Sequence, residues 1–207
     1  VGSHTYSAKA IDNNGGATDS SSTTVSAVAY TETTSIARGS LWKYLDNGTD
    51  QGTAWKDSAF DDSAWASGAA KFGYGDSQVT ILREGPSGAV STVKYITYYF
   101  RKKFSIAPGS QVIGLSANLL RDDGAIIYLN GTEIGRSNMP SGTVNYQTLS
   151  SSAVGGTDET TFFPLTLPYG AVVAGENTIA VSVHQSATSS SDLGFDLRLN
   201  AGTTPAE

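Results

Sequence analysis

The sequence contains no cysteine, and its charged residues make up only 15% of the 207 positions. Without cysteine, no disulfide can stabilise the fold and no thiol can act as nucleophile or metal ligand. Acidic residues outnumber basic ones, and the net charge is −6. Since contacts to phosphate groups need a basic surface, this balance argues against nucleic acid or an anionic membrane as partner.

Long hydrophobic runs are also missing. No stretch approaches the roughly 18 apolar residues of a membrane-spanning helix, and no signal peptide is visible. The sequence begins within an alternating pattern and ends in the loose polar stretch "GTTPAE". We therefore expect a piece of a longer protein, with residues 202–207 as a tail.

What the sequence does contain is a series of short runs with a period of two. The run "YITYYFRKKFSI", for example, places five apolar residues on one face: Ile96, Tyr98, Phe100, Phe104 and Ile106. Such alternation is typical of strands, and here turn-rich loops separate the runs. The sequence predicts an all-β fold in which two antiparallel sheets pack as a sandwich over residues 31–201.

Residues 1–30 have a different character. Two alternating runs flank the turn sequence "DNNGG", which predicts a hairpin with a glycine-rich loop. The pattern "Y-x-A-x-A-x-D-x-x-G", followed by a Ser/Thr-rich strand, resembles the last strands of bacterial immunoglobulin-like repeats. We interpret this segment as the end of such a repeat, or as a linker, with no functional site.

Three motif groups in the rest of the chain carry a second resemblance. They are "W-x-Y-L-D-x-G … F-D-D-S-x-W … G-Y-G-D", "R-D-D-G-x-x-x-Y-L-N-G-x-E-x-x-R-x-N-M-P" and "V-H-Q … S-S-D-L-x-F-D-L-R-L". Together they span Leu41 to Leu199 and resemble the galactose-binding-like jelly rolls appended to secreted bacterial enzymes and surface proteins. The resemblance implies a jelly-roll sandwich and an extracellular, multidomain parent protein. Members of this group bind sugars in some cases and only space domains in others.

The stretch "LLRDDGAIIYLNGTEIGRSNMP" indicates where a ligand would bind. If "DDG" and "NG" both reverse the chain, "SNMP" returns to the end of the sandwich that holds "RDDG". A strand through 180–183 would bring two more polar residues there. The predicted patch consists of Arg121, Asp122, Asp123, Arg136, Asn138, His184 and Gln185, with Tyr74 as an aromatic face for a pyranose ring. These groups suit sugar hydroxyls.

The same residues also have a purely structural interpretation. Asp-Asp-Gly and Asn-Gly are what tight turns require in any sandwich. Arg121 and Asp192 would then form an ion pair that holds the loops together. Both interpretations remain open at the level of the sequence.

The loop "DNGTDQGT" concentrates oxygen ligands of the kind that Ca²⁺ prefers, although it does not match an EF-hand. Galactose-binding-like modules often hold a structural calcium between an early loop and the last strand. Carried over by position, the resemblance implies Asp46, Asp50 and Thr53 with Asp196 as ligands. The alternative is an exposed hairpin loop without a metal.

Nothing in the sequence indicates catalysis. There are only two histidines, and no nucleophile elbow, zinc-binding helix or phosphate-binding loop is present. The acidic pairs are sequence neighbours, whereas glycosidase carboxylates face each other across a cleft. We therefore predict a monomeric, non-catalytic carbohydrate-binding module that targets a parent enzyme to a polysaccharide. The alternatives are a structural or adhesive spacer and an accessory sandwich packed on a phosphoesterase.

Overall fold

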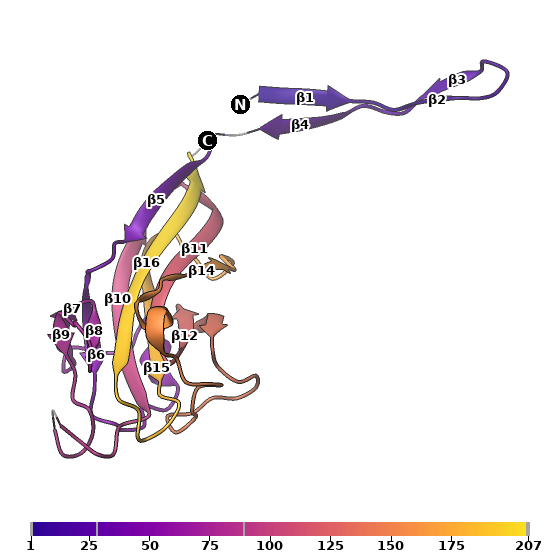
Figure 1. Cartoon of the computed structure of the whole chain (residues 1–207). Helices are drawn as coiled ribbons and strands as arrows, with labels where there is room; N and C mark the ends of the chain where they lie inside the picture. The colour runs from indigo at the N-terminus through magenta and orange to yellow at the C-terminus, as the bar shows by residue number, and fades with distance from the viewer. Residues whose placement is uncertain (1, 28, 89, 206–207) are drawn as a thin grey trace.

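The computed structural model describes residues 2–27, 29–88 and 90–205. Two six-stranded sheets pack against each other as a sandwich (Figure 1). The predicted all-β sandwich is thus confirmed. Helical structure in the described residues is confined to two short 3₁₀ turns, η1 (Ala54–Lys56) and η2 (Gly156–Thr160). Neither is long and apolar enough to cross a membrane.

The first sheet is antiparallel throughout and has the order β13-β12-β15-β10-β6-β7. Its long central strands are β15 and β10, which pair over ten residues each. The bounds of the strands are β6 (Leu41–Leu45), β7 (Ala66–Ala69), β10 (Thr97–Ile106), β12 (Gly124–Leu129), β13 (Thr132–Ser137) and β15 (Gly175–His184).

The second sheet has the order β14-β11-β16-β8-β9, with β5 also paired to β16. Strand β8 pairs with the beginning of β16, and β5 pairs with its second half. One pair, β8–β9, is parallel and departs from the predicted antiparallel arrangement. The bounds are β5 (Thr31–Ile36), β8 (Phe72–Tyr74), β9 (Thr80–Ile81), β11 (Gln111–Asp122), β14 (Phe163–Leu167) and β16 (Leu193–Thr204).

An aromatic cluster between the sheets forms the centre of the core. The rings of Phe100 and Phe195 lie 4.3 Å apart, and Phe72 and Trp42 pack against them at 5.0 and 5.3 Å. The first two come from opposite sheets, so the cluster holds the two layers together. Truncating one such buried ring costs about 3–5 kcal/mol. The predicted inward face of β10 is correct, since Tyr98, Phe100, Phe104 and Ile106 are all buried.

The outer face of the first sheet is covered as well. A second apolar cluster lies there, formed by Trp55, Trp65, Tyr99, Ile126, Tyr128, Met139 and Ala180. The loop between β6 and β7 supplies both tryptophans and is fastened by the buried Arg101. Its Nε donates to Asp62 Oδ2 at 2.8 Å, and its Nη1 donates to the carbonyl oxygen of Asp57 at 3.1 Å. Strand β10 is therefore buried on both faces over most of its length.

The N-terminal segment forms the predicted ribbon and extends away from the sandwich (Figure 1). Strand β1 (Gly2–Tyr6) pairs with β4 (Thr23–Ala27), and β2 (Lys9–Ile11) pairs with β3 (Ala17–Asp19). All of these residues are exposed. The ribbon therefore adds no buried apolar surface to the sandwich core.

A shortened chain that begins at Ala29 tests this separation. Since residues 2–27, the described part of the deleted segment, are all exposed, we expect the melting temperature of the sandwich to change by no more than about 1–2 °C. A chain that begins at Ala37 is the matched comparison. It also lacks β5 and the buried Ile36, and we expect it to melt several degrees lower by circular dichroism. An equal fall in melting temperature in both shortened chains would contradict the independence of the ribbon from the sandwich core.

Candidate functional site

The stretch "RDDG" marks a crossing between the two sheets. Strand β11 ends at Asp122 in the second sheet, and β12 begins at Gly124 in the first. The predicted hairpin turn at "DDG" is therefore wrong, because the chain changes sheet there. The second predicted turn is correct: Asn130 and Gly131 have φ of 50° and 88°, as a type I′ turn between β12 and β13 requires.

The crossing brings several predicted ligand residues to one end of the sandwich, which we call the crossover rim. Gly124 pairs with His184 across β12 and β15. Asn138 Nδ2 donates to the carbonyl of Asp123 at 3.0 Å. Gln185 Nε2 donates to the hydroxyl of Tyr74 at 2.6 Å. These contacts join four separate chain segments.

The crossover rim is closed rather than open to solvent. The exposed fractions are Tyr74 2%, Arg121 8%, Asp122 1%, Asp123 1%, His184 1% and Gln185 0%. The ring of Tyr74 has no exposed face on which a pyranose could stack, so this predicted role is wrong. Within the predicted set, Gln185 and Tyr74 bond to each other, while Asp123, Asn138 and His184 bond to backbone groups.

Asp123 shows how the crossover rim is closed. Its Oδ1 accepts a hydrogen bond from the Val154 amide at 2.6 Å, and its Oδ2 accepts one from the Ser186 amide at 2.7 Å. A carboxylate that accepts backbone N–H groups forms strong, charge-assisted bonds. This side chain therefore ties two loops to the crossing between the sheets.

The two predicted arginines are also engaged within the fold. Arg121 lies over the ring of Phe163, at 4.2 Å from its centroid, and its Nε donates to Ser137 Oγ at 3.0 Å. Arg136 forms a two-bond pair with Glu133, at 2.6 and 2.8 Å. The alternative ion pair between Arg121 and Asp192 is not among the ion pairs of the described residues.

Within the described part of the chain, the predicted calcium ligands Asp46, Asp50 and Asp196 do not form a group of converging carboxylates. Asp46 Oδ2 accepts from the Arg83 amide and Asp50 Oδ1 from the Gly52 amide, both at 2.8 Å. Asp196 accepts from the amides of Gly39 and Leu197. Thr53, the fourth predicted ligand, is exposed just before η1. Each of these three carboxylates thus accepts at least one backbone N–H group. Among the described residues, the acidic side chains that do converge are Asp76, Glu159 and Asp192.

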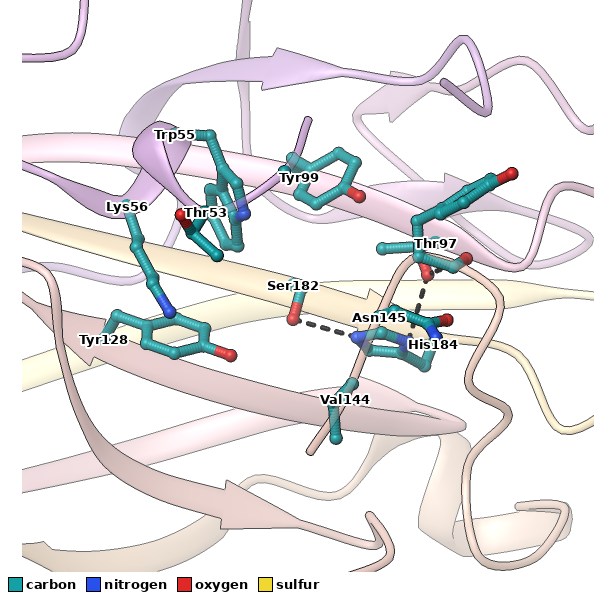
Figure 2. A pocket seen from close by; sticks show the side chains of 12 residues that line it. Thr53, Trp55, Lys56, Thr97, Tyr99, Tyr128, Val144, Asn145, Ser182 and His184 are labelled. Atoms are coloured by element: carbon teal, nitrogen blue, oxygen red, sulfur yellow. Dashed lines mark hydrogen bonds between the residues drawn. The ribbon is translucent and has the colours of Figure 1, made fainter. Parts of the chain in front are cut away.

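A different site lies on the outer face of the first sheet (Figure 2). Strands β10, β12 and β15 form the floor of a cavity of about 50 Å³, and two loops, 52–56 and 144–146, form its walls. Sequence reasoning missed it, and of the predicted ligand and metal-binding residues only His184 and Thr53 line it. The lining residues are Gly52, Thr53, Trp55, Lys56, Thr97, Tyr99, Tyr128, Val144, Asn145, Tyr146, Ser182 and His184.

Aromatic rings dominate one side of this cavity, which we call the aromatic pocket. Trp55 packs edge to face on Tyr99 at 4.7 Å and on Tyr128 at 5.5 Å. The ammonium of Lys56 lies 4.7 Å from the centroid of Tyr128. Burial raises the pKa of Tyr128 to about 12, and that of Tyr99 is raised by burial as well. Both phenols are therefore protonated hydrogen-bond donors at neutral pH.

His184 forms the polar end of the aromatic pocket, where Figure 2 shows its bonds to Thr97 and Ser182. Its Nδ1 lies 2.8 Å from the carbonyl of Thr148 and 3.0 Å from Thr97 Oγ1. Because a carbonyl only accepts, Nδ1 carries the proton, and Nε2 accepts from Ser182 Oγ at 2.9 Å. Burial lowers the pKa of His184 to about 4, so the ring is neutral.

Comparison with known proteins gives a fold but no family. No family model matches the chain, and no curated protein sequence does. Among solved structures, apo β-glucuronidase from Ruminococcus gnavus is similar with a TM-score of 0.50 and 9% identity, over 83% of this chain and 29% of that one. An uncultured Clostridium β-glucuronidase gives 0.49 and 17%, over 87% and 30%. A calcium-binding mutant of Bacteroides uniformis β-glucuronidase 2 gives 0.49 and 18%, over 84% and 18%.

These likenesses concern the sandwich alone. The chain spans less than a third of each of the three enzymes. At such low identity, the agreement with the Ruminococcus gnavus protein supports the β-sandwich fold and carries no information about a ligand.

The buried, neutral His184 predicts a dependence of stability on pH. Its folded pKa of about 4 lies below the unfolded value of 6.5. Its stabilising contribution is therefore complete above pH 6.5 and is lost as the pH falls toward 4, by up to about 1.4 kcal/mol per pH unit.

Urea denaturation between pH 7 and 4.5 measures this effect as the difference in the free energy of unfolding between the wild type and His184→Asn. The difference is needed because burial raises the pKa of Asp122 to about 8, and this group titrates in the opposite sense in both proteins. The control is His4→Asn, at the other histidine of the chain, which is exposed. We expect its free energy of unfolding to change with pH as that of the wild type does. If the free energy of unfolding of His184→Asn depends on pH as steeply as that of the wild type, the low pKa assigned to His184 is wrong.

Proposed function

We propose that the sandwich is a non-catalytic carbohydrate-binding module, and that it binds its glycan at the aromatic pocket. The observation that carries this proposal is the combination of lining groups. Trp55, Tyr99 and Tyr128 supply aromatic surface, while Lys56 and Asn145 supply polar groups at the mouth. Sugars need both kinds of group, because a pyranose has an apolar face and a rim of hydroxyls.

The size of the aromatic pocket limits what enters it. At about 50 Å³, it is much smaller than the roughly 300–1,000 Å³ of pockets that enclose a drug-sized ligand. We expect it to take one edge of a sugar, such as a hydroxymethyl group, while the rest of the glycan lies on the two loops. The exposed Asn145 and the half-buried Tyr146 are placed to contact that outer part.

The residues that line the aromatic pocket are consistent with the proposed binding role. Glycosidases need two carboxyl groups about 5–10 Å apart across the bound sugar. The described residues that line the aromatic pocket include no Asp or Glu. Its histidine is neutral and bonded at both ring nitrogens, so it is not poised as a general base.

The role of such a module would be to hold a larger secreted bacterial protein on a polysaccharide. The motif resemblance over Leu41 to Leu199 supports this setting. A single shallow site gives modest affinity, and attachment to a parent enzyme or to further modules would raise it through effective concentration. The module would act as a monomer.

The closed crossover rim favours a second candidate function, that of a structural spacer. Asp123, Asn138 and His184 are satisfied within the fold, as a domain that only separates its neighbours would require. In that case the aromatic pocket is a packing detail of the loops. The spacer and the binding module differ in one measurable property, which is glycan binding.

Affinity electrophoresis of the full chain against neutral and acidic polysaccharides distinguishes the two. We expect retardation by at least one polysaccharide. Tyr146→Ala and Lys56→Ala should each weaken it about tenfold, since each removes a contact of about 1.4 kcal/mol at the mouth of the aromatic pocket.

Matched controls come from the same residue types elsewhere. Tyr169 and Lys103 are exposed and lie outside the aromatic pocket, so Tyr169→Ala and Lys103→Ala should be retarded like the wild type. If none of the polysaccharides retards the wild type, the spacer is favoured. Equal weakening by pocket and control variants would show that the glycan binds elsewhere.

A further inference from the structure

Three acidic side chains meet at one end of the second sheet. One carboxylate oxygen each of Asp76, Glu159 and Asp192 lies within 4.8 Å of those of the other two. Calcium binds oxygens at about 2.3–2.6 Å, so two of its ligand atoms are at most about 5 Å apart. The spacing of this cluster is therefore that of oxygens around one shared cation.

The sheet itself sets this arrangement. Tyr74 at the end of β8 pairs with Leu193 at the start of β16, which brings the residues just beyond these positions together. A Cβ on Gly75 would lie 2.5 Å from Cβ of Asp192, so only glycine permits the approach of the two segments. Glu159 comes from η2, which packs on β11.

A fourth carboxylate, that of Asp122, supplies an independent observation. Its side chain is 1% exposed, and neither of its oxygens has a hydrogen-bond partner. Asp122 pairs with Gly194 on β16, and a Cβ on Gly194 would lie 3.7 Å from its own Cβ. Asp192 lies two residues before Gly194, just outside β16, and the charges of Asp192 and Glu159 both act on Asp122. The unpartnered carboxyl group of Asp122 therefore lies beside the acidic cluster, with the stem of Lys71 next to it: Lys71 Cε is 3.3 Å from where a Cβ on Gly194 would be.

The charges of these residues are not balanced within the fold. Lys71 Nζ lies 3.5 Å from Asp76 Oδ2, and the charge of Arg121 acts on Asp122, so two cations face four acidic side chains. Burial, followed by the charges of Asp192 and Asp123, raises the pKa of Asp122. An unpartnered buried carboxylate costs several kcal/mol, whereas the adjacent Asp123 has both oxygens satisfied by amides.

We propose that Asp76, Asp122, Glu159 and Asp192 bind a structural Ca²⁺ ion. All the ligand atoms are hard oxygens from an irregular set of loops, which suits calcium better than zinc or the strictly octahedral magnesium. The ion ties the loop after β8 and the η2 segment to the crossing between the sheets. Three of the four ligands belong to the motifs "GYGD", "RDDG" and "SSDL". This site is separate from the aromatic pocket and does not depend on glycan binding.

Isothermal titration of the chelator-treated full chain with CaCl₂ tests the proposal. We expect one ion per chain, and a rise in melting temperature on the order of 5–10 °C at a hundredfold excess over Kd. Asp192→Asn and Asp122→Asn should each reduce the affinity at least tenfold. Asp76→Asn serves as the variant least able to disturb folding, because its side chain is 29% exposed, and we expect the same loss.

Asp50→Asn is the matched control, since it removes an exposed carboxylate from the other acidic loop. It should bind calcium like the wild type. The proposal is overturned if the wild type releases no heat and gains no thermal stability at millimolar calcium. It is equally overturned if binding survives in Asp76→Asn and Asp192→Asn but is lost in Asp50→Asn. Circular dichroism of each variant verifies that a lost signal does not come from unfolding.

Discussion

The crossing of the chain from one sheet to the other at Asp122–Gly124 is the constraint on which both the crossover rim and the acidic cluster depend. Two long strands, β11 and β12, meet there while belonging to different layers. The short connection places two carboxylates inside the sandwich. One of them, Asp123, is satisfied by the amides of Val154 and Ser186, and this holds the neighbouring loops over the crossover rim. The other, Asp122, has no hydrogen-bond partner among the described residues, and the charges of Asp192 and Glu159 act on it.

The outer face of the first sheet is likewise covered by a loop that a buried charged side chain holds in place. A sheet with one wet face would show polar residues at alternate positions, but β10 is buried on both faces over most of its length. The loop between β6 and β7 supplies the cover, and the buried Arg101 fastens it through a carboxylate and backbone carbonyls. Where this loop and the segment 144–146 do not meet, the aromatic pocket remains.

The segment from His184 to Asp192 runs between the two candidate sites. It leaves the aromatic pocket at the neutral His184, and its Ser186 amide binds Asp123 at the crossover rim. It ends at Asp192 in the acidic cluster, where Gln185 Nε2 holds the Asp192 carbonyl at 2.8 Å. The ordering of this segment would therefore contribute to both proposed sites, although the two proposed ligands, a glycan and Ca²⁺, differ in chemical class.

The sequence alone determined the local structure of this protein. Period-two alternation located strands such as β10, and the dipeptide Asn130–Gly131 located a type I′ turn, because both depend only on near neighbours. The sequence also grouped the polar residues that meet at the crossover rim. Only the tertiary structure decided that this rim is closed and that Asp192 converges with Asp76 and Glu159. The physical reason is that alternation assigns a side chain to a face of a strand, whereas burial and ligand geometry depend on which distant loop covers that face.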